Sequence, residues 1–156
     1  MENIPLLAAV RDNQLLRKER VLVDQAWCEL RDCVHAREFQ KAAALLVSKP
    51  RLISLKNDRG QTVLHDRAMD NDLESVAWLH AHGFDLDACN GLGVPLVFEV
   101  AALGLKELLL WLKQAGADFR AVDGEGRPLV VYLRECNTAK ANGMIDFVGA
   151  LFVPDN

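Results

Sequence analysis

Two groups of side chains in this sequence have the residue types to bind a metal ion or exchange protons, one of histidines with aspartates and one of aspartates alone. The first group is His80, His82, Asp85 and Asp87, and the second is Asp70 and Asp72. Residues two positions apart on a helix point in different directions, so the two imidazoles are not expected to share one ion. The aspartates lack the glycine and the bidentate glutamate of a calcium loop. We therefore predict turn and helix-cap roles for them, and no metal or other cofactor.

Motifs for catalysis are not found in the sequence. There is no G-x-S-x-G motif, and Ser48 and Ser54 have no base near them, so a serine triad is not indicated. Gly124 and Gly126 are followed by Arg-Pro-Leu, which breaks the G-x-G-x-x-G pattern of a nucleotide-binding turn. We predict that the protein is not an enzyme.

The charge and hydropathy patterns argue against two classes of partner. The formal net charge is −4, so there is no basic field to attract nucleic acid or an anionic membrane. No apolar run approaches the ~20 residues that a membrane span needs. The short apolar run Ile4–Val10 lacks the basic region that precedes the core of a signal peptide. We expect a cytoplasmic protein that binds neither nucleic acid nor membrane.

The cysteines are Cys28, Cys33, Cys89 and Cys136, and no two of them form a C-x-x-C pair. This spacing indicates neither a zinc knuckle nor a redox motif. We expect reduced, buried thiols, because a free cysteine packs like a small apolar side chain.

The elements that position these residues repeat every 33 positions. This step relates identical residues, namely Trp78 and Trp111, Gly83 and Gly116, and Gly60, Gly93 and Gly126. A fixed period of this length is typical of a solenoid, in which each unit buries its apolar face against its neighbours. We expect both tryptophans to stack in the core of the array.

Apolar spacing and helix-stop residues predict a series of helices within this period. The expected helices are Pro5–Trp27, Glu29–Ala36, Phe39–Val47, Thr62–Met69, Leu73–His82, Pro95–Leu103, Leu105–Ala115, one that ends near Cys136, and Met144–Phe152. Pro50 stops one helix and Gly83 another, because proline cannot continue a helix and glycine accepts the left-handed conformation at its end. We expect Leu52–Leu55 to be extended and Asn137–Gly143 to be a loop.

Two short motifs connect this period to a known family. They are Gly60-Gln61-Thr62-Val63-Leu64-His65 and Gly116-Ala117-Asp118. They resemble the G-x-T-P-L-H start and the L-L-x-x-x-G-A-D end of ankyrin repeats. A hydrogen bond between the Thr and the His typifies this family, and in this chain only Thr62 and His65 are both present to form it. In the next unit, Pro95 and Phe98 take these two positions.

The resemblance implies an all-α ankyrin-repeat solenoid of about four helix–turn–helix units with an N-terminal helical cap. We expect a single domain over residues 1–156. Its expected parts are the cap at 1–26, a degenerate repeat at 27–56, repeats at 57–89 and 90–122, and a C-terminal capping repeat at 123–156. Terminal repeats depart from the pattern because their outer faces have no neighbour.

In this family, partners dock on the concave face, which is formed by the turn tips and the first helices of the units. Carried over by register, this face contains Asp58, Arg59, Asp66, Met69, Asp70, Leu92, Glu99, Leu103, Glu125, Arg127, Tyr132 and Glu135. Its acidic residues and its apolar strip suit a basic protein partner. The last predicted helix is an alternative surface for a partner or a second copy, with Met144, Ile145, Phe147, Val148, Leu151 and Phe152.

The resemblance implies a non-catalytic protein-binding module. Small single-domain ankyrin proteins occur as bacterial immunity proteins, which block a toxin that is often a basic nuclease. We therefore predict a stoichiometric inhibitor of this kind. The alternative is a regulatory or scaffolding adaptor that recruits other proteins. An inhibitor forms a 1:1 complex that abolishes an activity, whereas an adaptor holds two partners at once.

Overall fold

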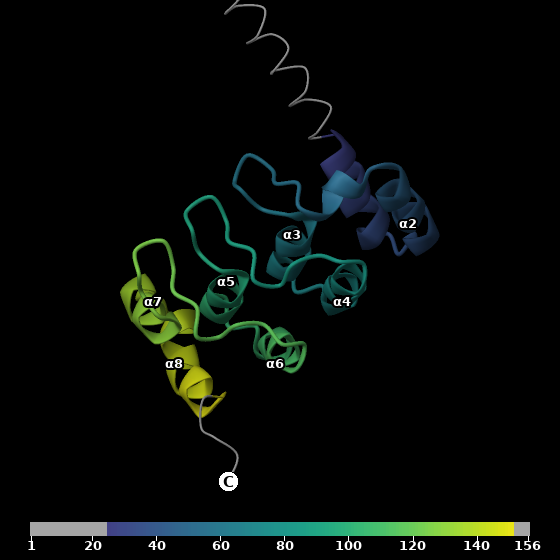
Figure 1. The fold of residues 1–156 in the computed structure, drawn as a ribbon. Helices are drawn as coiled ribbons and strands as arrows, with labels where there is room; N and C mark the ends of the chain where they lie inside the picture. The colour runs from purple at the N-terminus through teal and green to yellow at the C-terminus, as the bar shows by residue number, and fades with distance from the viewer. Residues whose placement is uncertain (1–24, 152–156) are drawn as a thin grey trace, which may run out of the picture.

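The computed structural model describes residues 25–151, which form a row of paired helices joined by loops (Figure 1). Residues 25–35 are helical, and the elements that follow are α2 (Phe39–Ser48), the 3-10 helix η1 (Pro50–Ile53), α3 (Val63–Met69), α4 (Leu73–Ala81), α5 (Leu96–Ala102), α6 (Lys106–Gln114), α7 (Leu129–Cys136) and α8 (Ala139–Leu151). The β pairings within this part of the chain are two isolated bridges, Cys89 with Pro95 and Val122 with Pro128. The all-α solenoid that the sequence predicts is confirmed. The predicted helix Pro5–Trp27 and the cap at 1–26 lie outside the described residues, except for their last few positions.

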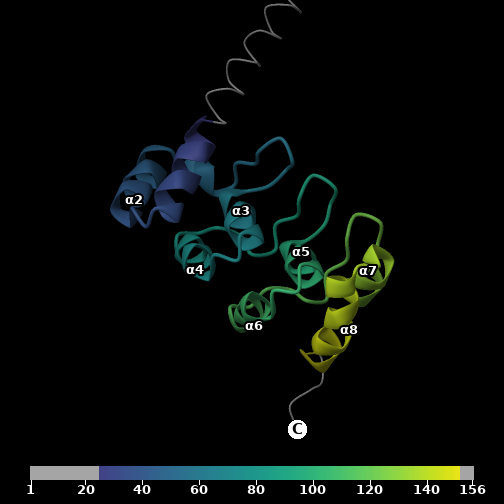
Figure 2. The ribbon, with the colours of Figure 1, turned by 180° about the vertical axis from the view of Figure 1, so that it is seen from behind.

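The helices of successive units lie in two layers (Figures 1 and 2). Helices α3, α5 and α7 follow one another beside the long loops, while α4 and α6 lie in the second layer. Helix α5 packs against both α3 and α7. Each first helix is therefore enclosed by its neighbours, and Leu64, Phe98 and Leu133 are completely buried.

A left-handed residue joins the two helices of each unit. Asn71 joins α3 to α4, Gly104 joins α5 to α6, and Asn137 joins α7 to α8, with φ of 57°, 74° and 49°. Glycine and asparagine accept this conformation more readily than other residues. Arg37, with φ of 63°, takes the corresponding place before α2. The sequence period is thus also a period of backbone conformation.

The predicted hydrogen bond between Thr62 and His65 is confirmed, and it caps α3. Thr62 Oγ1 lies 3.1 Å from His65 Nδ1 and accepts the backbone N–H of His65 at 3.4 Å. In return, the backbone N–H of Thr62 donates to Nδ1 at 3.4 Å, which completes a capping box. Helices α5 and α7 begin after Pro95 and Pro128, which provide no side-chain cap.

We expect His65 to make the fold sensitive to acid. The side chain is completely buried, and this burial lowers its pKa from 6.5 to about 4. The unfolded chain therefore takes up a proton at higher pH than the folded chain does. The contribution of neutral His65 to the free energy of unfolding should be fully present above pH 6.5. It should be lost as the pH decreases through 4, by about 3 kcal/mol in total. Urea unfolding over this pH range measures the loss.

His65→Asn is the control for this prediction, because the amide oxygen can still accept the Thr62 N–H but does not titrate. The free energy of unfolding of this variant should depend less on pH over the same range. An NMR titration that finds the His65 imidazole of the wild type protonating near its ordinary value would contradict the prediction.

The extended conformation predicted for Leu52–Leu55 is wrong, because Pro50–Ile53 forms a 3-10 helix. Proline suits the first turn of a helix, since its φ is already fixed there and its missing N–H is not needed. The turn buries Leu52, which is 2% exposed. The helix predicted to begin at Glu29 is longer than expected, since residues 25–35 are helical without a break.

The loop predicted for Asn137–Gly143 is also wrong, because α8 already begins at Ala139. Thr138 Oγ1 accepts the backbone N–H of Ala141 at 3.1 Å and so caps the helix. A glycine such as Gly143 inside a helix costs about 1 kcal/mol. Helix α8 packs against α5 and α7, and burial of Met144 in this contact outweighs that cost.

Helix α8 does not present the exposed apolar surface that its sequence suggests. Met144 and Val148 are buried, and Ile145 and Phe147 are half-buried against the core. Lys106 Nζ from α6 lies 5.5 Å over the Phe147 ring. These apolar side chains close the end of the array instead. Leu151 is half-buried as well, and Phe152 lies outside the described residues.

The prediction that Trp78 and Trp111 stack in the core is wrong. Both are only half-buried, in the second helices α4 and α6. Trp78 stacks on Phe39 and on His82, with ring centroids 5.3 Å and 3.8 Å apart. Trp111 meets His80 in an edge contact at 5.8 Å. The second layer is covered on one side only, so these rings pack neighbouring helices together at its outer edge.

Candidate functional site

Three loops project beside the first helices, and we call them fingers 1, 2 and 3 (residues 57–61, 90–94 and 123–127; Figures 1 and 2). One side-chain oxygen closes each finger by accepting two backbone N–H groups. Asn57 accepts from residues 59 and 61, Asn90 from residues 92 and 94, and Asp123 from residues 125 and 127, at 2.8–3.1 Å. This is the turn role that asparagine and aspartate often have. The fingers therefore hold their tips in defined positions.

The residues predicted for the concave face fall into two groups by exposure. Asp58, Arg59, Asp70, Leu92, Leu103, Glu125 and Glu135 are exposed, while Asp66, Met69, Glu99, Arg127 and Tyr132 are half-buried. Among the exposed residues, Leu92 is a large apolar side chain with 83% of its surface accessible at the tip of finger 2. The fingertips are thus the parts of this face that a partner can reach most easily.

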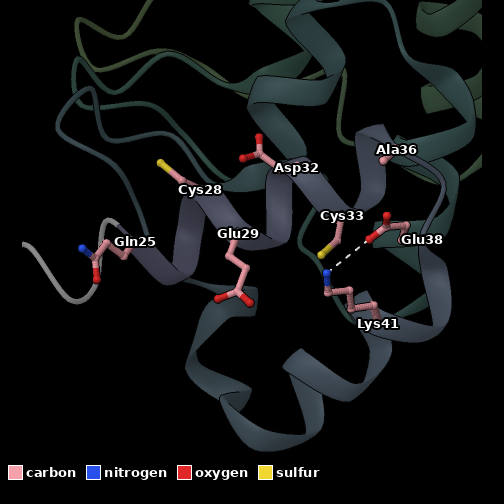
Figure 3. Close-up of a pocket in the computed structure, with 8 residues that line it drawn as sticks. All are labelled: Gln25, Cys28, Glu29, Asp32, Cys33, Ala36, Glu38 and Lys41. Carbon is pink, nitrogen blue, oxygen red and sulfur yellow. Dashed lines mark ion pairs between the residues drawn. The ribbon is translucent and has the colours of Figure 1, made fainter.

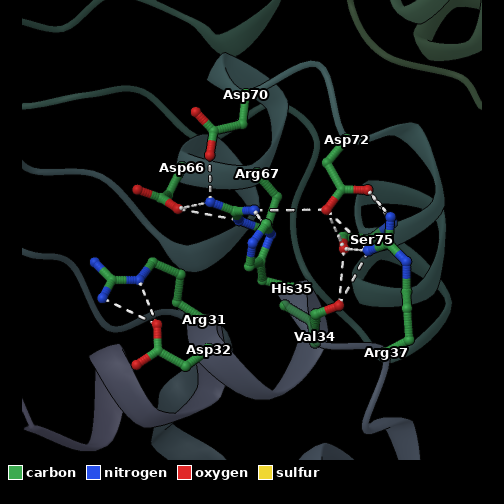
Figure 4. Close-up of polar contacts among 10 residues, drawn as sticks. All are labelled: Arg31, Asp32, Val34, His35, Arg37, Asp66, Arg67, Asp70, Asp72 and Ser75. Atoms are coloured by element: carbon green, nitrogen blue, oxygen red, sulfur yellow. Dashed lines mark hydrogen bonds and ion pairs between the residues drawn. The ribbon is translucent and has the colours of Figure 1, made fainter.

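Arg67 connects the charged residues at the N-terminal end of the predicted concave face, as the contacts in Figure 4 show. Its charged side chain is only 6% exposed. Nη2 lies 2.8 Å from Asp66 Oδ2 and 2.5 Å from Asp70 Oδ2. Nη1 donates to His35 Nδ1 at 2.9 Å and lies 3.5 Å from Asp72 Oδ2. A buried charge requires such partners. Asp66 and Asp70 therefore balance Arg67 inside the fold as well as facing the surface.

Arg37 and Asp72 continue this network, and together with His35 they connect it to the segment 27–56, which the sequence predicts to be a degenerate repeat (Figure 4). Both terminal nitrogens of Arg37 donate to the carboxylate of Asp72, at 2.7 Å and 2.9 Å. Ser75 Oγ donates to the same carboxylate at 2.6 Å, and Arg37 also donates to the carbonyl of Val34 at 3.1 Å. Burial alone would raise the pKa of Asp72, but the bonds from Arg37 and Ser75 hold it well below its usual range.

The sequence provides a signal for only part of this network. Arg67 stands where ankyrin repeats usually carry a small apolar residue, so an arginine in the middle of an apolar helix is the detectable feature. The pairing of Arg37 with Asp72 has no such signal, because the two residues lie 35 positions apart.

Arg127 connects the charged residues at the C-terminal end of the predicted concave face. Its Nε donates to Asp123 Oδ2 at 2.7 Å, its Nη1 is paired with Glu135, and Glu125 Oε2 lies 3.5 Å away. The guanidinium also lies 5.6 Å from the centre of the Tyr132 ring. Hydrogen bonds to Glu135 and Asp123 raise the pKa of Arg127, so this group stays charged.

Glu99 lies between these two ends and is more enclosed than the sequence suggests. Asn90 donates a hydrogen bond to Glu99 Oε1. Burial raises the pKa of Glu99, against the opposing effect of Asn90. Burial also raises the pKa of nearby Tyr132 to about 12, so this ring is a neutral phenol at neutral pH. Tyr132 packs on Phe98 at 5.3 Å.

A surface pocket of about 670 Å³ lies between residues 25–35 and α2 (Figure 3). Cys28 and Cys33 both line it, but they point to different sides of their helix. Burial raises the pKa of the Cys33 thiol, which makes it a weaker nucleophile. The prediction that all thiols are buried is wrong, because Cys33 is buried but Cys28, Cys89 and Cys136 are half-buried. All four thiols are free.

The predicted turn and cap roles are confirmed for Asp72 and Asp85, whereas the Asp70 side chain pairs with Arg67 and Asp87 connects two units. Asp72 caps α4 by accepting the backbone N–H of Ser75. Asp85 accepts the N–H of Asp87 at 2.9 Å, and Asp87 accepts the N–H of Asp118 in the next unit at 2.7 Å. Within residues 25–151, no group of three or more His, Cys, Asp or Glu side chains is arranged to hold a metal ion.

Over the same part of the chain, no helix has both the length and the apolar character that crossing a membrane requires.

Comparison with protein-family models matches residues 64–104 to ankyrin repeats (many copies). The matched residues run from α3 through α4 and finger 2 to the turn after α5. A search among curated proteins finds no match. Helix pairs and fingers of the same kind continue on both sides of the matched segment.

Proposed function

We propose that this chain, which belongs to the ankyrin-repeat family, binds one basic protein through its concave face and has no catalytic activity. Ankyrin repeats are protein-binding modules in general. In its most concrete form, the proposal is that the chain acts as a cytoplasmic stoichiometric inhibitor, such as an immunity protein that neutralises a cognate toxin.

The distribution of charge over the concave face is the observation that supports this proposal. Its carboxylates are Asp58, Asp66, Asp70, Glu99, Glu125 and Glu135, and its guanidiniums are Arg59 and Arg127, with the buried Arg67 beside Asp66 and Asp70. The carboxylates outnumber the guanidiniums, so this face is acidic overall. Leu92 and Leu103 are exposed among them and supply apolar contact area. Such a surface attracts a basic partner and accelerates its association.

The structure indicates which of these residues can test binding without damaging the fold. Asp66 balances the buried Arg67, and Glu99 is enclosed beside Asn90. Reversing either charge would disturb the fold itself. Asp58 and Glu125 lie at the tips of fingers 1 and 3 and are exposed, so they are the better positions.

We expect Asp58→Lys and Glu125→Lys each to weaken binding of the partner by about tenfold or more, because like charges would then face each other across the interface. Purification of the tagged chain from its native cells, with size-exclusion chromatography and mass spectrometry, identifies the partner. Titration calorimetry with the purified partner then measures the variants. Glu107→Lys, an exposed position on α6 in the second layer, is the matched control.

A 1:1 complex with a basic protein whose own activity is lost in the complex would support the inhibitor. Two different proteins held at the same time would favour the adaptor instead. If Glu107→Lys weakens binding as much as Glu125→Lys does, the concave face is not the binding surface.

A further inference from the structure

We infer that Arg127 occupies, from within the chain, the place on the concave face that an arginine of the partner takes in the complex. This inference rests on the proposed function, and it names the chemistry of the partner at one corner of the face. The corner consists of Glu125, Glu135 and Tyr132 around the guanidinium of Arg127.

The two halves of the Arg127 guanidinium have different surroundings. Its Nε is bonded to Asp123, whose side chain is only 1% exposed. The other oxygen of Asp123 is already used by two backbone N–H groups of finger 3. The Nε half is therefore part of the structure of the finger, because a buried carboxylate oxygen would otherwise lose its partner.

The Nη1 half of Arg127 faces groups that solvent can reach. The side chains of Glu135 and Glu125 are 53% and 75% exposed. The Tyr132 ring lies beside them and is held in place by Phe98. Carboxylates next to an aromatic ring favour a flat guanidinium, which pairs with the oxygens and packs on the ring, over the compact ammonium of lysine. An external arginine can use the same groups once the exposed Glu135 carboxylate turns from Nη1 towards it.

The exchange has a simple consequence for affinity. A partner's guanidinium gains Glu135 only by drawing this exposed carboxylate away from Arg127 Nη1, while the planar guanidinium of Arg127 stays bonded to Asp123. Arg127 thus lowers the affinity of this corner for every cationic ligand. The loss is largest for ligands whose binding depends most on contacts at this corner. Removing its charge should strengthen arginine binding.

Arg127→Gln tests this inference, because the glutamine amide nitrogen takes the position of Nε and can still donate to Asp123. The probes are an octa-arginine peptide and an octa-lysine peptide at low salt. We expect R127Q to bind octa-arginine about fivefold more tightly than the wild type does, which is the size of an exposed ion pair. Arg59→Gln is the matched control with the same change of charge on finger 1, and we expect only about a twofold gain from it.

Two further measurements isolate the corner. The double variant R127Q/E135Q should lose most of the gain, because the released carboxylate is gone. The chain has one tyrosine, so the ring signals of Tyr132 in an NMR spectrum report this corner alone. In the wild type, octa-arginine should shift these signals more than octa-lysine does. This second readout does not depend on the folding of R127Q.

The outcomes separate the inference from the proposed function. If neither the wild type nor R127Q binds either peptide at low salt, the acidic docking face is overturned. If both peptides bind, but equally to the wild type, R59Q and R127Q and without shifting the Tyr132 signals, the role of Arg127 is overturned and the acidic face stands.

Discussion

Replacement of Gly60 by alanine should destabilise the fold by about 2–5 kcal/mol, because two separate penalties meet at this residue. Gly60 has φ of 72°, in the left-handed region, where alanine costs roughly 1–2 kcal/mol. A Cβ at this position would also lie 2.5 Å from Gly91 Cα in finger 2, and closer still to its backbone nitrogen. That nitrogen donates to the carbonyl of Arg59 at 3.0 Å, so the two fingers cannot separate without losing the bond.

Gly126→Ala is the matched control, because Gly126 has nearly the same φ, 77°, at the same place in finger 3. A Cβ there meets nothing within 4 Å. This variant should carry the conformational cost alone, about 1–2 kcal/mol. Urea unfolding followed by circular dichroism measures both variants. Equal losses at the two positions would show that the close approach of fingers 1 and 2 adds no penalty at Gly60.

The second large effect is expected from Arg67→Met, which should cost about 3 kcal/mol. Methionine keeps much of the apolar packing, but it leaves Asp66, Asp70 and His35 without the buried guanidinium that they share. Asp72 should lose less, because it keeps both hydrogen bonds from Arg37.

Arg31→Met is the control for this variant. Arg31 pairs with Asp32 at 3.0 Å near the surface, where Arg31 is half-buried and Asp32 is exposed to solvent. Removal of such a pair costs less than about 1 kcal/mol. Hydrogen exchange provides a second test, since loss of the Arg67–His35 bond should increase exchange in residues 25–35 more than in α7. An R67M variant as stable as R31M would show that this network does not hold the helix of residues 25–35 in place.

Much of the architecture follows from local chemistry that is visible along the chain. Gly83 and Gly116 end α4 and α6 because they accept a left-handed backbone, with φ of 99° and 97°. The Thr62–His65 cap joins residues only three positions apart. Such interactions depend on neighbours in sequence, and the 33-residue period repeats them, so the sequence alone determined the fold class and most helix boundaries.

The tertiary structure decided the rest, because it depends on contacts between units. Gly143 lies within α8 because that helix packs against α5 and α7, although its local preference favours a break. The acidic row of the concave face looks uniform in sequence, but Asp66 balances a buried arginine, Glu99 is enclosed, and Glu125 stays exposed. Burial and ion pairing of a side chain depend on which residues from other units surround it. Period and spacing place such a residue on a face, but they do not specify the charges and the solvent that it meets there.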